Sequence, residues 1–398
     1  MRSPASHVAC PEKRLLVCCA RTRMPPAVAE RLRALAAGAL DWDFVFAAAA
    51  ENSITPLLVL QLRATAADVL PPGVRERLRD AAHAHVARSL LGIAELIRIS
   101  EAFRRDGIQA IPYKGPVLAA QAYGDMTLRE FGDLDIVLSQ RDMAQANELL
   151  VSLGYHARFP WILSPGAAAS LVPGEYNYRD ESGRLLVELH TEVTLRHFPV
   201  RLDLDDLAQR LVPVSLSRQE IRTFGPEDGI LLLCVHGAKD FWERISWVAD
   251  IAELVQAQPL DWEAVFQRAE SLRLGRMLRL GLQLARGLLD APLPVEIAAR
   301  VSGDAVAASM ASEIEHRLLG RKVAPLGAGE VLRFRRRMVE GTVAGWRYFL
   351  RLATIPAEED WQMVRLPRPL APLYVALRPL RLLWKYGRAR GRLPQTPE

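Results

Sequence analysis

The chain has 398 residues, half of them hydrophobic, and a formal net charge of +5, so it is long enough for two domains or for one domain with helical extensions. Its four cysteines have neither metal-ligand nor disulfide spacing, which favours a reducing, cytoplasmic compartment over a secreted, disulfide-stabilised protein. The N-terminus has no signal-peptide pattern, and the apolar run 15–20 is too short to span a membrane.

Residues 1–105 are predicted to form an N-terminal helical region. A helix at 28–36 is followed by one that Asp41 caps and by a third that begins at Thr55. A long helix, about 74–105, then carries a stripe of apolar side chains along one face. We expect this region to pack as a helical cap on a sheet.

Residues 106–225 are predicted to be the catalytic core, which contains most of the strands. Strands are expected at 108–113, 133–138 and 185–190, with helices at 116–123 and 141–152.

The stretch 156–183 is interrupted by prolines and glycines, which predicts a mobile loop or a hairpin beside the site. Trp161, Tyr176 and Tyr178 lie in it. Their rings can stack on a base or pack in the core, and the sequence leaves both alternatives open.

Asp133 and Asp135 lie in the strand predicted at 133–138. Residues i and i+2 of a strand point to the same face, so both carboxylates project from one side of an otherwise apolar strand. Paired carboxylates repel each other, and a divalent cation resolves this conflict. Such a pair with Mg²⁺ is typical of phosphoryl and nucleotidyl transfer. The alternative is a pair of turn-forming or helix-capping aspartates.

The turn Lys114-Gly115 joins a predicted strand to a helix N-terminus. This arrangement predicts an anion site, because free backbone N–H groups point at the ligand. Lys114 adds a charge suited to phosphate, and it is one of only five lysines in the chain. The alternative is an ordinary solvated lysine.

Glu188 and His190 share one face of the strand predicted at 185–190. A carboxylate among aliphatic residues is the third acid expected near a two-metal pair, either as a ligand or as the base that activates an acceptor hydroxyl. The alternatives are a solvent-facing glutamate on an edge strand, and a histidine that is hydrogen-bonded at a strand end.

Residues 226–330 are predicted to form a helical domain, in which His236 and Lys239 lie on one face of the first helix. Residues 331–398 are predicted to be a basic helical region that mixes Arg with Leu and Trp. A basic, aromatic, amphipathic helix can contact a membrane surface, and the alternative is a helix packed on the domain. No aromatic-rich recognition motif accompanies these charges, which argues against nucleic acid as a partner.

These motifs resemble a family of largely uncharacterised bacterial nucleotidyltransferases of the polymerase-β-like superfamily. The segments that carry the resemblance are Lys114-Gly115, Leu128-Arg129-Glu130-Phe131-Gly132-Asp133-Leu134-Asp135, Gly154-Tyr155 and Glu188-Leu189-His190, with the helical segments 236–240 and 247–251. The chain departs from the superfamily in its first turn, where many members carry Gly-Ser.

The resemblance implies an α+β fold: a small mixed-sheet nucleotidyltransferase core flanked by N-terminal and C-terminal helical regions. It implies Mg²⁺ or Mn²⁺ held by three catalytic acids, which are Asp133, Asp135 and Glu188. A nucleoside triphosphate such as ATP is expected at Lys114, Gly115 and Arg129. Four further residues are implied near the acceptor or in support of the site, namely His190, His236, Lys239 and Asp250.

We therefore predict a metal-dependent nucleotidyltransferase that moves a nucleoside monophosphate to an unknown acceptor hydroxyl and releases pyrophosphate. The acceptor is a small molecule, a peptide or a protein. The alternatives are a phosphotransferase on the same scaffold and a catalytically weak regulatory or binding protein at the membrane surface.

Overall fold

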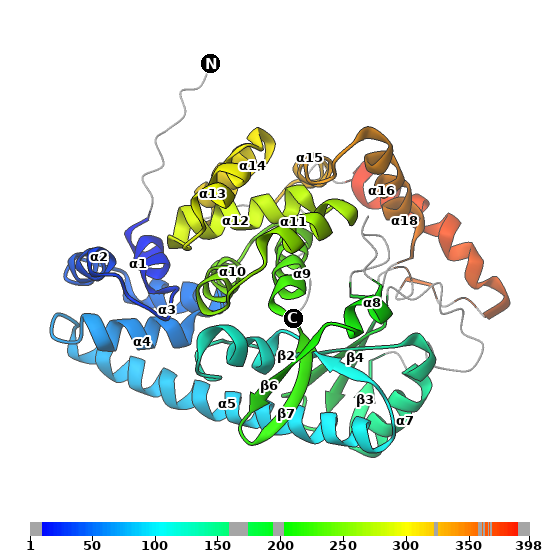
Figure 1. The fold of residues 1–398 in the computed structure, drawn as a ribbon, viewed down its shortest axis with the longest axis horizontal. Coiled ribbons are helices and arrows are strands. Elements are labelled where there is room, and N and C mark those ends of the chain that lie inside the picture. The colour runs from blue at the N-terminus through cyan, green and yellow to red at the C-terminus, as the bar shows by residue number, and fades with distance from the viewer. Residues whose placement is uncertain are drawn as a thin grey trace.

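The structure is a computed structural model. It describes residues 10–158, 174–193, 203–321, 325–356 and 368–388, together with residues 360, 363, 364 and 366. Strands and helices form the α+β fold expected from the sequence. In Figure 1 the strands lie in the lower half, a long helix runs beneath them, and the later helices cover the opposite side.

The N-terminal region is helical, as predicted. Its helices are α1 (Pro11–Cys19), α2 (Pro26–Ala36), α3 (Trp42–Glu51), α4 (Thr55–Thr65) and α5 (Pro72–Arg105). The capping role predicted for Asp41 is confirmed, because its carboxylate accepts a hydrogen bond from the backbone N–H of Phe44 at 3.1 Å. The first helix, α1, was not anticipated from the sequence.

A five-stranded mixed sheet forms the centre of residues 106–225, with the strand order β1-β2-β5-β4-β3. The strands are β1 (Ala110–Pro112), β2 (Asp133–Leu138), β3 (Tyr155–Ala157), β4 (Glu175–Asp180) and β5 (Leu186–His190). β2 and β5 are parallel, and the other neighbours are antiparallel. The three predicted strands are confirmed, with the first shorter than expected. The antiparallel β3–β4 pair agrees with the hairpin alternative at both ends of 156–183, and residues 159–173 lie outside the described residues.

The helices between these strands also follow the prediction, with one difference. The helix expected at 116–123 is α6 (Gly115–Leu118) followed by a π-helical turn, η1 (Ala119–Tyr123). The helix expected at 141–152 is α7 (Met143–Ser152), preceded by the 3-10 turn η2 (Gln140–Asp142). π-Helical turns are rare in proteins, and those that occur are often found at functional sites.

A second sheet was not anticipated. After the short helix α8 (Leu204–Ala208), β6 (Leu211–Leu216) and β7 (Gln219–Phe224) form an antiparallel hairpin. Pro213 within β6 removes a backbone donor, which conceals a strand in the sequence. The hairpin is joined to the main sheet where the Thr223 hydroxyl donates to the Pro112 carbonyl at 2.7 Å.

The remainder of the described chain is helical, as predicted for the region after residue 225. The helices are α9 (Pro226–Lys239), α10 (Ile245–Ala257), α11 (Trp262–Ser271), α12 (Gly275–Leu289), α13 (Val295–Ser302), α14 (Ala305–Leu319), α15 (Ala328–Met338), α16 (Thr342–Thr354), the 3-10 turn η5 (Arg368–Leu373) and α18 (Tyr374–Arg388). None of the described helices is long and apolar enough to cross a membrane.

Two residues of the basic C-terminal segment are not on a solvated face. Arg378 and Arg381 are buried and both pair with the buried carboxylate of Asp360. α18 is therefore held to the molecule by an ion-pair cluster, which agrees with a helix packed on the domain. Arg390 and Arg392, which belong to the same basic segment, lie outside the described residues.

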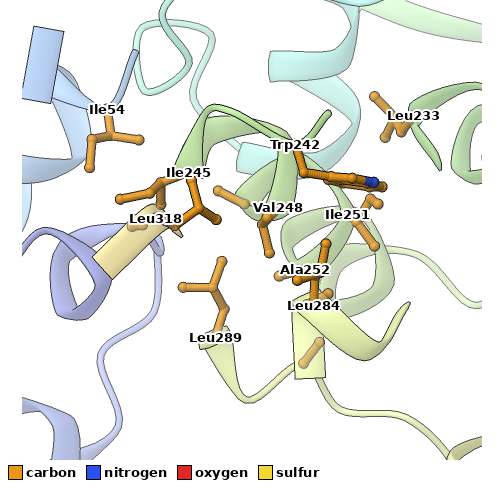
Figure 2. Close-up of a cluster of buried hydrophobic side chains, with 14 of the residues drawn as sticks. Ile54, Leu233, Trp242, Ile245, Val248, Ile251, Ala252, Leu284, Leu289 and Leu318 are labelled. Atoms are coloured by element: carbon orange, nitrogen blue, oxygen red, sulfur yellow. The ribbon is translucent and has the colours of Figure 1, made fainter. Parts of the chain in front are cut away.

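The hydrophobic interior has two large parts. One surrounds the main sheet and includes Leu96, Ile99 and Phe103 from the second half of α5. The other joins the N-terminal helices to the helices after residue 225. Figure 2 shows this second part, in which Ile54 and Leu318 lie around the side chains of α10. The predicted cap thus packs on both the sheet and the later helices.

Trp242 is fully buried beside two glycines, which gives a test of the packing. A Cβ at Gly237 would lie 2.5 Å from the indole ring, and one at Gly281 would lie 3.1 Å from it. Because the indole is fully buried, the added methyl group would overpack this part of the core. We therefore expect Gly237→Ala to lower the free energy of unfolding by about 1–3 kcal/mol.

Chemical denaturation of the variant and the wild type measures this effect. The matched control is Gly73→Ala in α5, because an added Cβ there meets no atom within 4 Å. If Gly237→Ala is as stable as Gly73→Ala, the packing around Trp242 is looser than described.

Candidate active site

A cleft with a volume of about 550 Å³ lies on one face of the main sheet and is lined by residues of β2, β4 and β5. Eight of the ten residues predicted to form the site line it, namely Lys114, Arg129, Asp133, Asp135, Glu188, His190, His236 and Lys239. Gly115 is buried behind Lys114, and Asp250 is buried behind Arg129, so neither belongs to the lining. The fold thus brings together residues that are far apart in the chain.

Asp135, Glu188 and His190 converge in this cleft. The parallel register of β2 and β5 places Asp135 opposite Glu188. The His190 Nε2 lies 3.1 Å from the Asp135 Oδ1 and 3.6 Å from the Glu188 Oε2. The three side chains each offer a ligand atom within 4.8 Å of the others. The two carboxylates offer the oxygen ligands that the predicted Mg²⁺ or Mn²⁺ prefers, whereas an imidazole is more typical of later transition metals.

Asp133 lines the same cleft but is not one of the three converging groups. It begins β2, where its partner in register is the aliphatic Leu186. Asp135 is 4 % exposed, whereas Asp133 is partly exposed at the mouth of the strand pair. The sequence predicted three acids as metal ligands, whereas the group that converges in the structure contains two of them together with His190.

The two aspartates differ in their charge environment. Burial, together with the charges of Asp135 and Glu188, raises the pKa of Asp133 to about 7. Burial alone would also raise the pKa of Asp135, but the Lys114 ammonium and the His190 hydrogen bond outweigh it. They hold the pKa of Asp135 well below its ordinary value. Asp135 is thus the permanently charged member of the pair.

Lys114 contacts the acids through a strained turn. Its Nζ donates to the Asp135 Oδ1 at 3.2 Å. Burial would lower the pKa of Lys114, but the nearby carboxylates, Asp135 above all, raise it above its ordinary value, so the ammonium stays charged. Its backbone has φ +55° and ψ −148°, a conformation that costs a side-chain-bearing residue about 1–3 kcal/mol and that clusters at functional sites.

His190 is also drawn into the charge network. Burial alone lowers the pKa of its imidazole, but the hydrogen bonds with Asp135 and Glu188 outweigh burial and raise that pKa to about 9. The imidazole is therefore protonated at neutral pH in this state. Binding a metal through His190 requires the release of that proton.

Arg129 and Asp250 form one unit. The Arg129 guanidinium donates to both carboxylate oxygens of Asp250 at 2.8 and 2.9 Å, and the Tyr123 hydroxyl donates to the same carboxylate at 2.6 Å. Asp250 is 1 % exposed. The aspartate thus positions Arg129 at the cleft wall.

A second wall of the cleft is formed by α9 and the turn after it. His236 and Lys239 line it, on the helix face that the resemblance placed near the substrate, and both lie near the Asp240 carboxylate at 3.5 and 3.7 Å. The His236 ring contacts the edge of Trp247 at a centroid distance of 5.1 Å. Burial, with the charges of Lys114 and Lys239, lowers the pKa of His236, so this imidazole is neutral.

Sequence reasoning missed Glu175, Asp240 and Trp247, which also line the cleft. Glu175 lies opposite His190 in the β4–β5 register, in a segment where Pro and Gly residues conceal the strand. Tyr176 and Tyr178 are buried in the sheet core. Of the two roles left open by the sequence, their rings therefore have the role of core packing. Trp161 lies outside the described residues.

The fold and the cleft define an α+β protein with a candidate divalent-cation site between two parallel strands. The chain belongs to the family described as uncharacterised nucleotidyltransferases, whose family model matches residues 38–290. This match contains the segments 114–155 and 188–251 that carry the resemblance, so the predicted membership of an uncharacterised nucleotidyltransferase family is confirmed. No curated protein matches the chain.

Among solved structures, the chain is similar to an antigenic nucleotidyltransferase-like protein from Paracoccidioides brasiliensis. The identity is 15 %, the TM-score is 0.30, and the match covers 55 % of this chain and 93 % of that one.

Proposed function

We propose that this protein is a metal-dependent nucleotidyltransferase. It moves a nucleoside monophosphate from a nucleoside triphosphate to an acceptor hydroxyl and releases pyrophosphate. The observation that carries the proposal is the convergence of Asp135, Glu188 and His190 in a cleft that also holds Asp133 and Lys114. Membership of the nucleotidyltransferase family supports the same reaction class.

Asp133, Asp135 and Glu188 would hold Mg²⁺ or Mn²⁺. The ion would neutralise charge on the triphosphate. Lys114 and Arg129 line the same cleft and would bind phosphate oxygens, with Gly115 allowing the tight turn behind Lys114.

Glu188 would accept the proton of the acceptor hydroxyl. The acceptor oxygen then bonds to the α-phosphorus, and the bond from that phosphorus to the leaving pyrophosphate oxygen breaks. The wall with His236 and Lys239 faces the acids across the cleft and is our candidate for the acceptor side.

The direct test uses the purified protein, Mg²⁺, host extract and nucleoside triphosphates labelled at the α- or the γ-phosphate. Transfer of the α-label to an acceptor, with release of pyrophosphate, is the expected result. Transfer of the γ-label identifies a phosphotransferase instead. Movement of neither label, with nucleotide still bound, identifies a binding or regulatory protein.

Lys114 gives a separate test of nucleotide binding. We expect Lys114→Ala to weaken binding of the triphosphate at least about tenfold, because a phosphate contact is lost from a partly desolvated site. Lys114→Arg is expected to restore binding only in part, because a planar fork and a point charge differ in geometry.

Calorimetric titration of nucleotide with Mg²⁺ present measures both variants. The matched control is Lys239→Ala, on the proposed acceptor side, which should bind the triphosphate as the wild type does. Equal nucleotide affinity in Lys114→Ala and the wild type would remove Lys114 from the phosphate site.

A further inference from the structure

The C-terminal helices carry large apolar side chains on their outer surface. On α16, Val343, Trp346 and Leu350 are 70 %, 78 % and 66 % exposed. On α18, Leu380 and Trp384 are 62 % and 60 % exposed. Single exposed apolar residues are ordinary, but a gathering of this kind marks an interaction site.

Helical geometry aligns these side chains. Residues 343, 346 and 350 follow the i, i+3, i+7 spacing of one helix face, and residues 380 and 384 follow the i, i+4 spacing of another. α16 and α18 pack against each other, so the two apolar stripes lie on neighbouring helices. Figure 1 shows this helix pair at the upper right, away from the N-terminal helices. We call the five residues the C-terminal apolar face.

The segment that carries this face is strongly basic. Residues 328–388 contain twelve Lys and Arg against five Asp and Glu. Three of the acids are already engaged: Glu330 caps the backbone of α15, Glu340 pairs with Arg279, and Asp360 is buried between two arginines. The other two, Glu358 and Glu359, lie outside the described residues.

One exposed arginine lies within the apolar face. Arg347 follows Trp346 directly on α16 and is exposed, and within the part of the chain that the structure describes it pairs with no carboxylate. A positive charge therefore lies beside Trp346.

We infer that the C-terminal apolar face docks on an anionic lipid surface. Tryptophan is enriched where a protein meets the membrane–water interface, because its ring has an apolar body and a polar N–H. Arginine beside it binds the phosphate of lipid headgroups and is attracted by anionic lipid. A second copy of this chain would bring the same positive charges together, which disfavours a self-interface. The inference does not depend on the proposed catalytic function.

Flotation of the full chain with lipid vesicles tests the inference without nucleotide. We expect binding to vesicles of phosphatidylcholine with phosphatidylglycerol, a loss of binding at high salt, and little binding to phosphatidylcholine alone. The double variant Trp346→Glu/Trp384→Glu is expected to reduce the bound fraction at least about tenfold, because a charge replaces each aromatic anchor at the interface. Arg347→Glu is expected to weaken binding to the anionic vesicles.

The matched control is Val295→Glu on α13, because Val295 is 80 % exposed and lies outside this face. It should bind vesicles as the wild type does. All substituted side chains are exposed, and melting curves verify that each variant folds. Absence of binding to anionic vesicles, or equal binding to zwitterionic vesicles, would overturn the inference. So would a dimer in light scattering that the tryptophan variant dissociates.

Discussion

Asp135→Asn is expected to abolish nucleotidyl transfer, to remove Mg²⁺-dependent nucleotide binding and to destabilise the protein. The carboxylate is 4 % exposed and accepts hydrogen bonds from Lys114 and His190. A neutral amide leaves both cations without their counter-charge. We expect a loss of about 3 kcal/mol in the free energy of unfolding, the lower end for a buried ion pair that loses one partner.

Asp133→Asn is the matched control for stability, since it changes a neighbouring carboxylate on the same strand. In the wild type, the pKa of the Asp133 carboxyl is raised, whereas an aspartate in the unfolded chain has a pKa of about 3.9. The folded protein therefore binds the Asp133 proton more tightly than the unfolded chain does. The stability contributed by the protonated form is complete below about pH 4 and is lost as the pH rises through about 7. Above pH 7, Asp133→Asn should therefore equal or exceed the wild type in stability, while transfer is still lost.

Thermal melts at pH 8 and calorimetric titration with Mg²⁺ plus nucleotide separate the two variants. The metal hypothesis is rejected if both variants bind Mg²⁺ and nucleotide as the wild type does. If Asp135→Asn is as stable as Asp133→Asn, the charge network around Asp135 is weaker than its geometry indicates.

Local patterns were sufficient to predict the elements that carry these residues. The apolar run after Asp133 and the alternation around Glu188 predicted β2 and β5, because strand formation at these positions is visible in the neighbouring residues. The hairpin β6–β7 was missed because Pro213 interrupts its pattern.

The pairing between segments that are distant in the chain could not be predicted from the sequence. The parallel register that sets Asp135 opposite Glu188 depends on how the sheet assembles, and the same is true of the bond between Arg129 and Asp250, 121 residues apart. The sequence therefore predicted which side chains have suitable chemistry. It did not predict that His190 would be hydrogen-bonded to Asp135 or that Asp250 would hold Arg129.

Glu188→Gln is expected to lower the rate of transfer at least about a hundredfold, the low end for a general base, with a smaller change in nucleotide affinity. The substituted glutamine would keep the volume of the side chain but could not accept the acceptor proton. Glu188 lies opposite Asp135 in the sheet register and 3.6 Å from the His190 Nε2, so it is placed to act beside the proposed ion. In the proposed site the two aspartates would still hold that ion, which is why affinity is expected to change less.

A matched variant on the next strand separates catalysis from cleft charge. Glu175→Gln removes one negative charge from the same cleft, at the position opposite His190, without touching the predicted base. We expect it to keep most of the turnover. Single-turnover rates and nucleotide dissociation constants for both variants distinguish proton transfer by Glu188 from an effect of overall cleft charge. Near-wild-type turnover in Glu188→Gln would make Glu188 a structural residue and leave a two-carboxylate site. Equal losses in both variants would indicate that overall cleft charge, and not proton transfer by Glu188, limits the reaction.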